Sequence, residues 1–323
     1  MATTIEISQL KQDFGTWLGT SEKDILKVLT QPTESMKFMT TVKQNDDYRA
    51  AQATIAALVQ GFQKGWTPKG TPTFTPLIIT HKRHKFDVEI YPDEIYGSWL
   101  GFLADESKSR EEWPLVKYIL YKMLLEQTAQ DRELSLIGSG SYAAIVDGTA
   151  QATGKSMDGF LTILKAQHAL GGTSKMNFAN KNVAITASNV IDQVEKFADT
   201  ITGPYKSIPM SVFCSPENLT FYTRKRRDLY GANQDYGKFG SADIDGTNLS
   251  LQALPSMIGS DILFCTPKAN FIRLLKLNDG ASRPFVETSK RQVFLYADWY
   301  ENVGFALAEA VWAFVPDPGS ASN

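Results

Sequence analysis

The sequence has few of the residues on which disulfide frameworks and metal sites depend. Of its 323 residues, only two are cysteine and three are histidine. Cys214 and Cys265 are too few for a disulfide framework or a four-ligand zinc site. Both lie in apolar runs, SVFCS and ILFCT, so we expect buried, reduced thiols. We expect no metal and no cofactor.

An excess of either charge is also missing, and so is a long hydrophobic run. The 33 Lys and Arg against 35 Asp and Glu give a net charge of −2. This balance argues against tight DNA binding through a broad basic surface, because such binding neutralises many phosphates. We find neither a secretory signal nor an apolar run long enough to span a bilayer, so we expect no membrane partner and synthesis inside the cell. With 43% hydrophobic residues the chain can still build a substantial core.

The usual catalytic motifs are absent: there is no nucleophile elbow, His-Glu-x-x-His, dinucleotide fingerprint or paired-cysteine motif. One segment imitates a phosphate-binding loop, because Gly154-Lys155-Ser156 stands between a strand-like run at 142–147 and a helix expected over 157–170. That motif needs a first glycine at position 149, which is threonine. We interpret the segment as a connection ending in a helix cap, with a nucleotide-binding enzyme as the weaker alternative. We expect His168 to occupy a solvent or core position, and no catalytic residues.

The run from Trp113 to Ile137 organises the chain. It contains no glycine and no proline after Pro114, so it predicts one helix of about 37 Å at roughly 1.5 Å per residue. Its first half is apolar nearly all round, and such a helix must be covered on every side, by its own sheet or by a neighbouring chain. A long core helix of an enzyme is the alternative. We expect three residues of this helix to make its packing contacts: Trp113, Leu120 and Leu124.

The residues before this helix predict projecting parts. Short helices are expected at 8–18, 21–29 and 48–62, none of them stable alone in water. Two strand-like runs, 74–80 and 85–91, predict a hairpin that packs on another subunit. Its tip is strongly charged, and we interpret it as an intersubunit contact, with a solvated turn and then a metal site as alternatives. The residues of this expected tip are His81, Lys82, Arg83, His84 and Lys85.

The second half of the chain predicts alternating strands and helices. A strand at 183–186 should precede a helix capped by Ser188, and a strand at 210–214 should precede a helix opened by Ser215-Pro216. A loop follows at 231–246. The helix after Ser215 carries a basic run that we interpret as a charged, contact-making face: Arg224, Lys225, Arg226 and Arg227. Further strands are expected at 249–254, 261–266, 271–277, 285–288, 291–305 and 310–315.

The order of these parts resembles the major capsid proteins of tailed bacteriophages of the Hong Kong 97 type. Three stretches are similar in style to those proteins: HKFDVEIYPDEIYGSWLGFL within 81–103, Asp131–Leu134 followed by GSGSY, and RQVFLYADWY at 291–300. The resemblance covers nearly the whole chain as an architectural order. It implies an α+β fold with an N-terminal arm, an extended loop, a spine helix and two domains.

The resemblance implies boundaries for these parts. The arm would be residues 1–64 and the extended loop 65–112. A peripheral domain would comprise 113–180 with 285–323, and an axial domain 181–284 would place the loop 231–246 near a five- or six-fold axis. The chain lacks a long charged helical segment before the arm, and it begins with Met1, so we expect any scaffolding protein to be separate. We assign no covalent cross-link, although Lys82 and Lys85 are candidates for one.

The implied function is that of a major capsid protein. Hexamers and pentamers of the chain would build an icosahedral shell around double-stranded DNA, in a virion assembled in the host cytoplasm. Scaffolding, portal and decoration proteins are the expected partners, and packaged DNA would be contacted weakly and without sequence preference. An encapsulin-type nanocompartment that encloses a cargo enzyme is the alternative, and a nucleotide-dependent enzyme is a third hypothesis.

Overall fold

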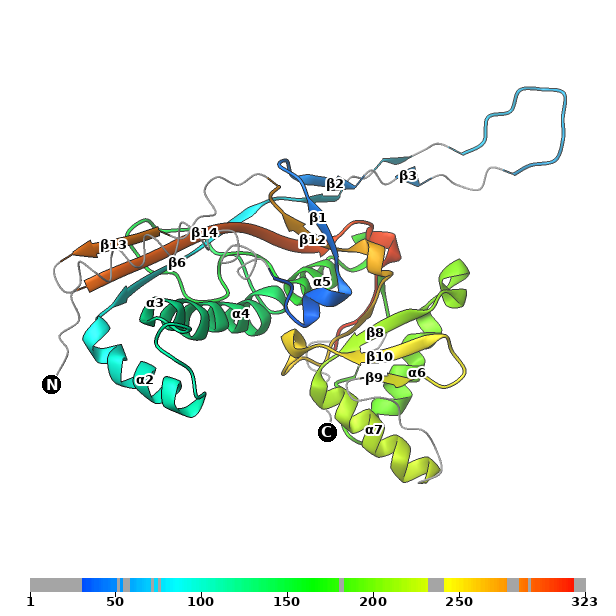
Figure 1. The fold of residues 1–323 in the computed structure, drawn as a ribbon. Coiled ribbons are helices and arrows are strands. Elements are labelled where there is room, and N and C mark those ends of the chain that lie inside the picture. The colour runs from blue at the N-terminus through cyan, green and yellow to red at the C-terminus, as the bar shows by residue number, and fades with distance from the viewer. Residues whose placement is uncertain are drawn as a thin grey trace.

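The computed structural model describes residues 31–50, 53–54, 59–70, 73–74, 77–179, 183–231, 241–277, 285–289 and 292–316. Two β-sheets, a long helix between them and a projecting extension make up the fold (Figure 1). The helices expected at 8–18 and 21–29 lie outside the described residues. No helix in the described parts of the chain is long and apolar enough to cross a membrane.

The first sheet is built around β14 (Gln292–Phe305), whose side chains alternate between the core and the opposite face up to residue 301. Along one edge β14 pairs antiparallel with the whole of β6 (Lys82–Ile90). Along its other edge lie β13 (Phe285–Ser289) and β12 (Phe271–Leu275), both antiparallel to it. β1 (Thr40–Lys43) then adds to β12 in parallel.

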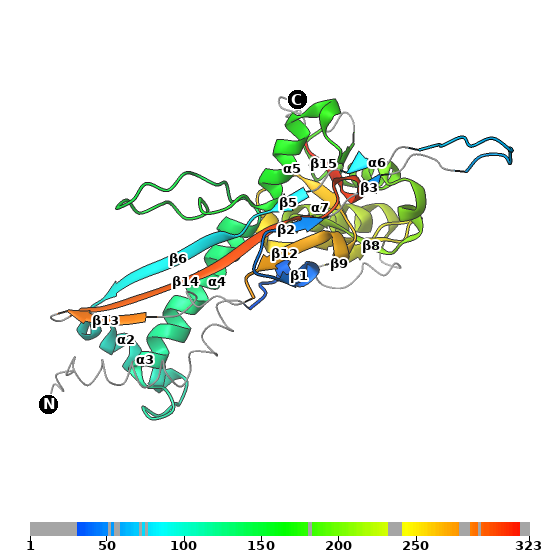
Figure 2. The same ribbon diagram turned by 90° about the horizontal axis from the view of Figure 1, so that it is seen from above.

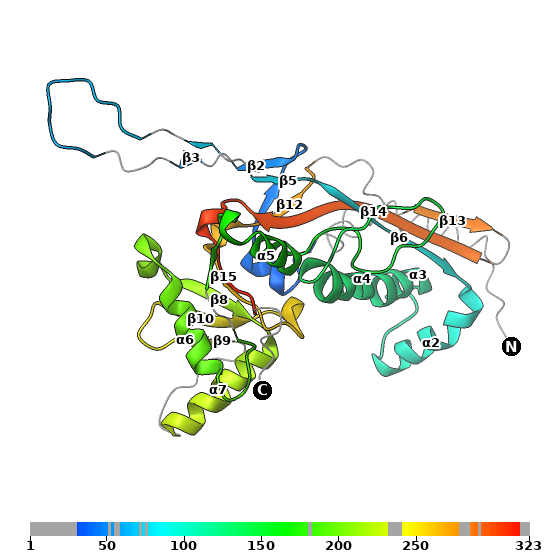
Figure 3. The ribbon, with the colours of Figure 1, turned by 180° about the vertical axis from the view of Figure 1, so that it is seen from behind.

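The second sheet has the order β7 (Asn177–Phe178), β15 (Trp312–Phe314), β11 (Leu263–Cys265), β8 (Met210–Cys214), β10 (Leu249–Ala253) and β9 (Ser241–Asp243). Helices α6 (Val190–Thr200) and α7 (Pro216–Tyr230) lie against it (Figure 3) and share one apolar core with it. Ser215 caps α7 because its hydroxyl accepts a hydrogen bond of 3.2 Å from the Asn218 amide, which confirms the predicted start of this helix.

A cluster of aromatic rings joins the two sheets. Phe264 of β11 lies 4.9 Å from Phe213 of β8 and 5.5 Å from Phe271 of β12, between ring centroids. Phe160, at the start of α5 (Phe160–Ala169), packs on Phe264 at 5.1 Å. The two sheets do not coincide with the two expected domains. β12 lies in the first sheet, although the expected axial domain includes it. β15 lies in the second sheet, although the expected peripheral domain includes it. The domain boundaries themselves stay a prediction.

The long helix runs from residue 115 to 137, two residues shorter at its start than expected. α3 (Leu115–Tyr118) and α4 (Glu126–Asp131) alternate with π-type turns at Ile119–Leu125 and Arg132–Ile137. Together with α2 (Pro92–Asp105) it covers the core face of β6 and β14 (Figure 1). Its apolar side is therefore covered largely by its own chain, while Lys122 and Met123 are exposed.

The projecting part of the chain differs from the expected one. β2 (Tyr48–Ala50) pairs with β5 (Leu77–Ile79), and β3 (Ala53–Thr54) pairs with β4 (Thr73–Phe74). We call these strands with residues 59–70 the extension, which projects away from the sheets in Figures 1 and 2. The expected helix at 48–62 is wrong at its start, because pairing with a partner strand overrides local helical spacing. The expected hairpin of 74–80 with 85–91 is also wrong.

Two weaker strand predictions are wrong as well. Residues 142–147 run through a loop. Two hydrogen bonds hold the start of this loop: the Ser141 amide donates to the Gly154 carbonyl at 2.8 Å, and the Ala143 amide donates to the Lys155 carbonyl at 3.0 Å. Residues 183–186 form no strand, and Asn189 rather than Ser188 stands at the start of α6. The expected strand Met210–Cys214 is confirmed.

Candidate functional site: a buried ionic junction

A charged side chain stands at a core position of β14. The alternation that buries Val293, Leu295, Ala297 and Trp299 continues to Glu301, which has no exposed surface. Neighbouring strands bring two further polar side chains to the same place: Arg273 of β12 and His84 of β6, each two positions from the residue directly opposite Glu301. Such diagonal neighbours lie on one face of a sheet. Strand register alone thus gathers these groups.

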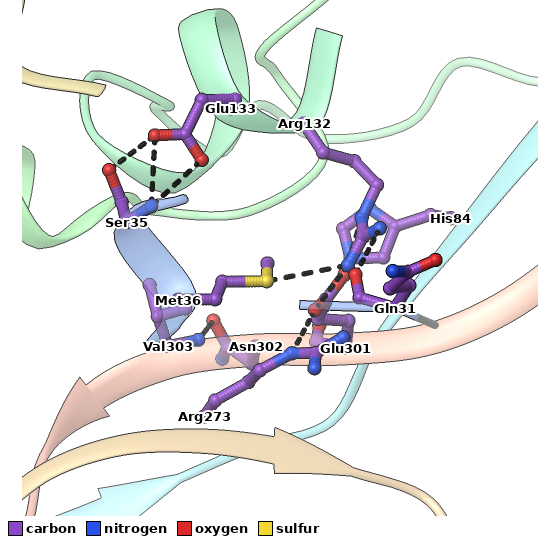
Figure 4. A network of polar contacts seen from close by, with 10 residues as sticks. All are labelled: Gln31, Ser35, Met36, His84, Arg132, Glu133, Arg273, Glu301, Asn302 and Val303. Carbon is purple, nitrogen blue, oxygen red and sulfur yellow. Dashed lines mark hydrogen bonds and ion pairs between the residues drawn. The ribbon is translucent and has the colours of Figure 1, made fainter. Parts of the chain in front are cut away.

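The fourth member comes from the long helix. The Arg132 guanidinium forms a bidentate pair with Glu301, Nε to Oε2 at 2.9 Å and Nη2 to Oε1 at 2.9 Å (Figure 4). Arg273 Nε donates to the same Oε1 at 2.6 Å. All three side chains are at most 2% exposed. We call Arg132, Glu301, Arg273 and His84 the ionic junction.

The charges explain why Glu301 stays ionised without contact with water. Burial alone would raise the pKa of its carboxyl, but Arg132 and Arg273 outweigh that effect and lower the pKa to about 2. Burial also lowers the pKa of Arg273, which Glu301 opposes, and a guanidinium stays protonated in any case. With a neutral His84, the junction carries one net positive charge.

His84 is held neutral in one tautomer. Its Nε2 lies 3.0 Å from the Glu301 carbonyl oxygen, which can only accept, so Nε2 carries the proton. Its Nδ1 then accepts a hydrogen bond of 2.8 Å from the Ser156 hydroxyl. The ring stacks on Trp299 at 5.5 Å between centroids. Burial lowers the pKa of His84, with hydrogen bonding and the charge of Glu301 opposing it.

A second polar cluster adjoins the first. Glu133, the next residue along the helix, accepts hydrogen bonds from the Ser35 amide at 3.2 Å and from the Ser35 hydroxyl. That hydroxyl also lies 2.6 Å from the hydroxyl of Ser256. Arg132 Nη1 donates to the Gln31 carbonyl at 3.3 Å (Figure 4). Successive residues of the long helix therefore fix the segment 31–36 against the body of the protein.

This arrangement can hold elements together but cannot reach a substrate. Its charged groups are buried and pair with one another, so no nucleophile or proton donor faces solvent there. Among the described residues, no group of three His, Cys, Asp or Glu side chains could hold a metal ion. The junction connects β6, β12, β14, the long helix and segment 31–36, so its role is to hold these elements together.

The expected hairpin tip does not exist as a turn, because residues 82–85 begin β6. His84 lies in the ionic junction, and Lys82 Nζ stands 3.7 Å from the centroid of the Tyr142 ring. Arg83 pairs with Asp298, and Lys85 with Asp87, on the solvent side of the sheet. The metal alternative for this tip has no support, since both nitrogens of His84 bind within the protein. An intersubunit contact through Arg83 and Lys85 stays a prediction.

The three residues expected to make the packing contacts of the long helix lie in one apolar cluster with α2 and the first sheet. Leu120 is 1% exposed, whereas Trp113 and Leu124 are half-buried. The Trp113 carbonyl accepts a hydrogen bond of 2.8 Å from the indole Nε1 of Trp99 on α2. All three residues therefore contact their own chain.

The basic run on α7 is divided between two environments. Arg224 and Arg227 are exposed and Lys225 is half-buried. Arg226 is buried: Nη2 pairs with Asp245 Oδ1 at 2.6 Å and Nη1 donates to the Asp243 carbonyl at 3.1 Å. The interpretation of Arg226 as part of a contact-making face is wrong, because it clamps α7 to the turn after β9. The other three stay candidates.

The segment that imitates a phosphate-binding loop has other contacts. Lys155 Nζ donates to the Ser141 hydroxyl at 2.7 Å, and Ser156 binds His84. The following helix begins only at Phe160, so its N-terminus does not adjoin Gly154 as the motif requires. His168 lies 5.0 Å from the Phe178 ring and is half-buried. Cys214 and Cys265 are buried free thiols, as expected, and burial raises the pKa of each.

Sequence reasoning missed the ionic junction, although one signal was present. His84 is in phase with Phe86, Val88 and Ile90, and Glu301 is in phase with the core positions of β14. A charged or titratable residue on the core phase of a strand predicts a buried partner. Nothing local indicates that the partner of Glu301 is Arg132, 169 residues away.

No protein-family model and no curated protein matches this sequence. Solved structures do match. The procapsid of satellite phage P4, which includes the size determination protein Sid, shares 11% identity at a TM-score of 0.54, covering 91% of this chain and 98% of that one. The capsid of an empty GTA particle shares 10% identity at 0.51, over 89% and 97%. The capsid of Myoviridae phage XM1 shares 8% identity at 0.51, over 88% and 92%.

Two sheets on a long helix, with a projecting extension, therefore constitute a phage capsid fold. The matches span nearly the full length of both chains, so the likeness is one of whole architecture. This confirms the α+β capsid fold that the order of elements predicted.

Proposed function

We propose that this chain is a major capsid protein that assembles with copies of itself into a closed icosahedral shell. Hexamers and pentamers would be the building units, and the shell would enclose double-stranded DNA in a virion assembled in the host cytoplasm. In this role the chain is a structural protein and not an enzyme. The ionic junction serves the role by making each subunit rigid.

The observation that carries the proposal is the extension. Its described tip exposes Val59, Phe62 and Trp66 at 90%, 96% and 92% of their surfaces. Burial of these apolar side chains against a partner surface would stabilise the contact by roughly 25 cal/mol per Å² of apolar area removed from water. Aromatic anchors of this kind are typical of protein interfaces. We infer that the tip packs on a neighbouring copy, in addition to any contact made by Arg83 and Lys85.

The remaining parts receive roles by position. Residues 31–43, with the chain before them, would form the N-terminal arm, and the second sheet with α6 and α7 would form the axial domain at the centre of each capsomer. Arg224, Lys225 and Arg227 would then contact neighbouring copies or the shell contents. Contacts in such obligate assemblies bury well above about 2,000 Å².

Scaffolding, portal and decoration proteins are the proposed partners, with packaged DNA contacted weakly. The near-neutral net charge of −2 supports weak contact, because strong retention of DNA requires many neutralised phosphates. We propose no membrane partner.

Electron microscopy of the purified full-length chain, alone and with the product of any neighbouring scaffold gene, tests the proposal. Closed icosahedral particles, hexamers or pentamers support it. A persistent monomer under every assembly condition contradicts it. Particles that enclose a cargo enzyme in place of DNA would identify an encapsulin-type nanocompartment. A nucleoside triphosphatase activity lost in a monomeric Lys155→Ala variant would identify an enzyme.

A further inference from the structure

A loop between the long helix and α5 projects beside β6, and Figure 2 shows it in green. We call residues 141–156 the finger. Its tip turns where the Val146 carbonyl accepts a hydrogen bond of 3.2 Å from the Thr149 amide. Ile145 and Val146 on this tip are 70% and 66% exposed. The finger is therefore a formed projection with an apolar end that faces solvent.

Both legs of the finger are attached to β6. Near its start, the Lys82 ammonium lies over the ring of Tyr142, with 3.7 Å from Nζ to the ring centroid. At its end, the Ser156 hydroxyl donates a hydrogen bond of 2.8 Å to His84 Nδ1. Lys82 and His84 are two positions apart on β6, so both attachments lie on the same phase of the strand. A change at His84 thus acts directly on the finger.

The hydrogen bonds of His84 leave no place for a second proton. Its Nε2 donates to the Glu301 carbonyl and its Nδ1 accepts from Ser156, so both nitrogens are in use. A proton on Nδ1 would face the Ser156 hydroxyl as a second donor. Protonation of the ring therefore ends the hydrogen bond that fastens the finger.

The charges around His84 also disfavour a second proton. The charged side chains of the ionic junction and of β6 next to the ring are Arg132 from the long helix, Arg273 from β12, Glu301 from β14 and Lys82 from β6 itself. On the finger, the Lys155 ammonium is bound to the Ser141 hydroxyl at 2.7 Å. Cations outnumber the single carboxylate, so a charged imidazole would add to an existing excess of positive charge.

Release of the finger removes both obstacles. A ring that is open to water takes up a proton at the usual histidine pKa of 6.5, whereas burial lowers the pKa of His84 in the attached arrangement. Proton uptake then stabilises the released state and not the attached one, so the equilibrium between the two depends on pH. Below pH 6.5, each further pH unit favours release by up to about tenfold.

We propose that the attachment of the finger to β6 responds to acid: the hydrogen bond between Ser156 and His84 holds the finger near neutral pH, and protonation of His84 releases it. Release frees the end that carries Ile145 and Val146, and so changes the apolar surface that the chain offers to a partner. The response belongs to one subunit and does not depend on the proposed shell.

Amide hydrogen exchange of the full-length, unassembled chain tests this response. The Ser141 and Ala143 amides bond across the base of the finger and report its opening. After correction for the intrinsic effect of pH on exchange, the opening constants of both amides should rise about tenfold from pH 7.5 to pH 5.5. Both pH values lie above 4.5, so Glu301 stays ionised throughout. Amides of β10 should exchange more slowly at both pH values, which identifies local opening and not global unfolding.

Two glutamine variants assign the response to one histidine. His84→Gln keeps a neutral acceptor and donor at this position but cannot titrate, so the rise should disappear. His168→Gln is the matched control, because His168 lies near the end of α5 and contacts Phe178, and the rise should persist. Ser156→Ala removes only the hydroxyl and should open the finger at pH 7.5 more than in the wild type.

Equal opening constants of the wild type at pH 7.5 and pH 5.5 would overturn the proposal, even if the His84 variant failed to fold. A rise that survives in folded His84→Gln, or that is lost in His168→Gln, would overturn it too. None of these measurements requires assembly, so a chain that builds no shell can still show the response.

Discussion

Arg132 and Glu301 form a two-pronged ion pair shielded from solvent, with two nitrogen–oxygen distances of 2.9 Å. One residue lies on the long helix and the other on the central strand of the first sheet. Since Arg273 shares the same carboxylate, the pair couples helix and sheet through charge rather than apolar packing alone. Buried pairs of this kind tolerate no loss of one partner, because the remaining charge has no water to solvate it.

Removal of Glu301 should therefore be among the most damaging single changes in the chain. Glu301→Ala leaves two buried guanidiniums facing each other, and we expect the free energy of unfolding to fall by about 3–5 kcal/mol. Urea unfolding of the unassembled chain, followed by circular dichroism, measures the loss. Lys85→Ala removes an exposed ion pair of the same sheet and should change the unfolding midpoint little. Similar losses in the two variants would contradict the structural role of the junction.

The stability of the chain should fall in two steps as the solution becomes more acidic. Burial lowers the pKa of His84 below its usual 6.5, so the unfolded chain binds a proton that the folded chain refuses, and stability declines as the pH falls below 6.5. Glu301 causes a second loss of stability between pH 4.5 and about pH 2, because in this range its carboxyl is protonated in the unfolded chain and ionised in the folded chain. Unfolding midpoints measured from pH 8 to about pH 2 check both windows. His84→Gln should flatten the upper window alone, and an unchanged slope there would contradict the assignment.

Gly138 should accept no side chain, because a Cβ at this position would lie 1.9 Å from the Ser256 carbonyl oxygen. We expect Gly138→Ala to displace the segment that carries Ser256 and to lower the melting temperature. Gly97→Ala is the matched control: it lies in α2 with no atom near the added methyl, and it should stabilise the chain by roughly 0.5–1 kcal/mol. Thermal unfolding of both variants should show shifts of opposite sign. Equal shifts would exclude the close approach at Gly138.

The exposed aromatic residues of the extension should matter for assembly and not for folding. Phe62→Ser with Trp66→Ser removes groups that are 96% and 92% exposed, so we expect the melting temperature of the unassembled chain to stay the same. Sedimentation and electron microscopy should show loss of hexamers and closed particles. Val59→Thr, a smaller change at the same tip, should weaken assembly less. Normal particles from the double variant would remove the tip from the interface.

Strands with a strict alternation and helices with clear end signals could be predicted from the sequence. The residues of β14 alternate over ten positions, and the Ser215-Pro216 start of α7 has a local physical cause in its cap. The long helix was predictable because glycine and proline are absent from 115–137. In each case the deciding information lies within a few residues.

The extension and the ionic junction could not be predicted in this way. β2 and β3 are strands because β5 and β4 pair with them, and such pairing depends on residues distant in the sequence. The charged run 81–85 is typical of a turn, and the clear alternation of apolar and charged residues begins only at Lys85, whereas β6 begins at Lys82. His84 belonged to the core phase of that strand, and its partners lie 72 and 217 residues away.

The pairing of β1 with β12 sets the order in which a subunit can be completed. The Thr40 hydroxyl donates to the Lys268 carbonyl, 228 residues further along the chain, at 2.8 Å. A ribosome adds about 5–20 residues per second, so the N-terminal strand waits roughly 11–46 s for its partner to be synthesised. Nascent chains therefore lack a finished first sheet until both β12 and β14 have been synthesised.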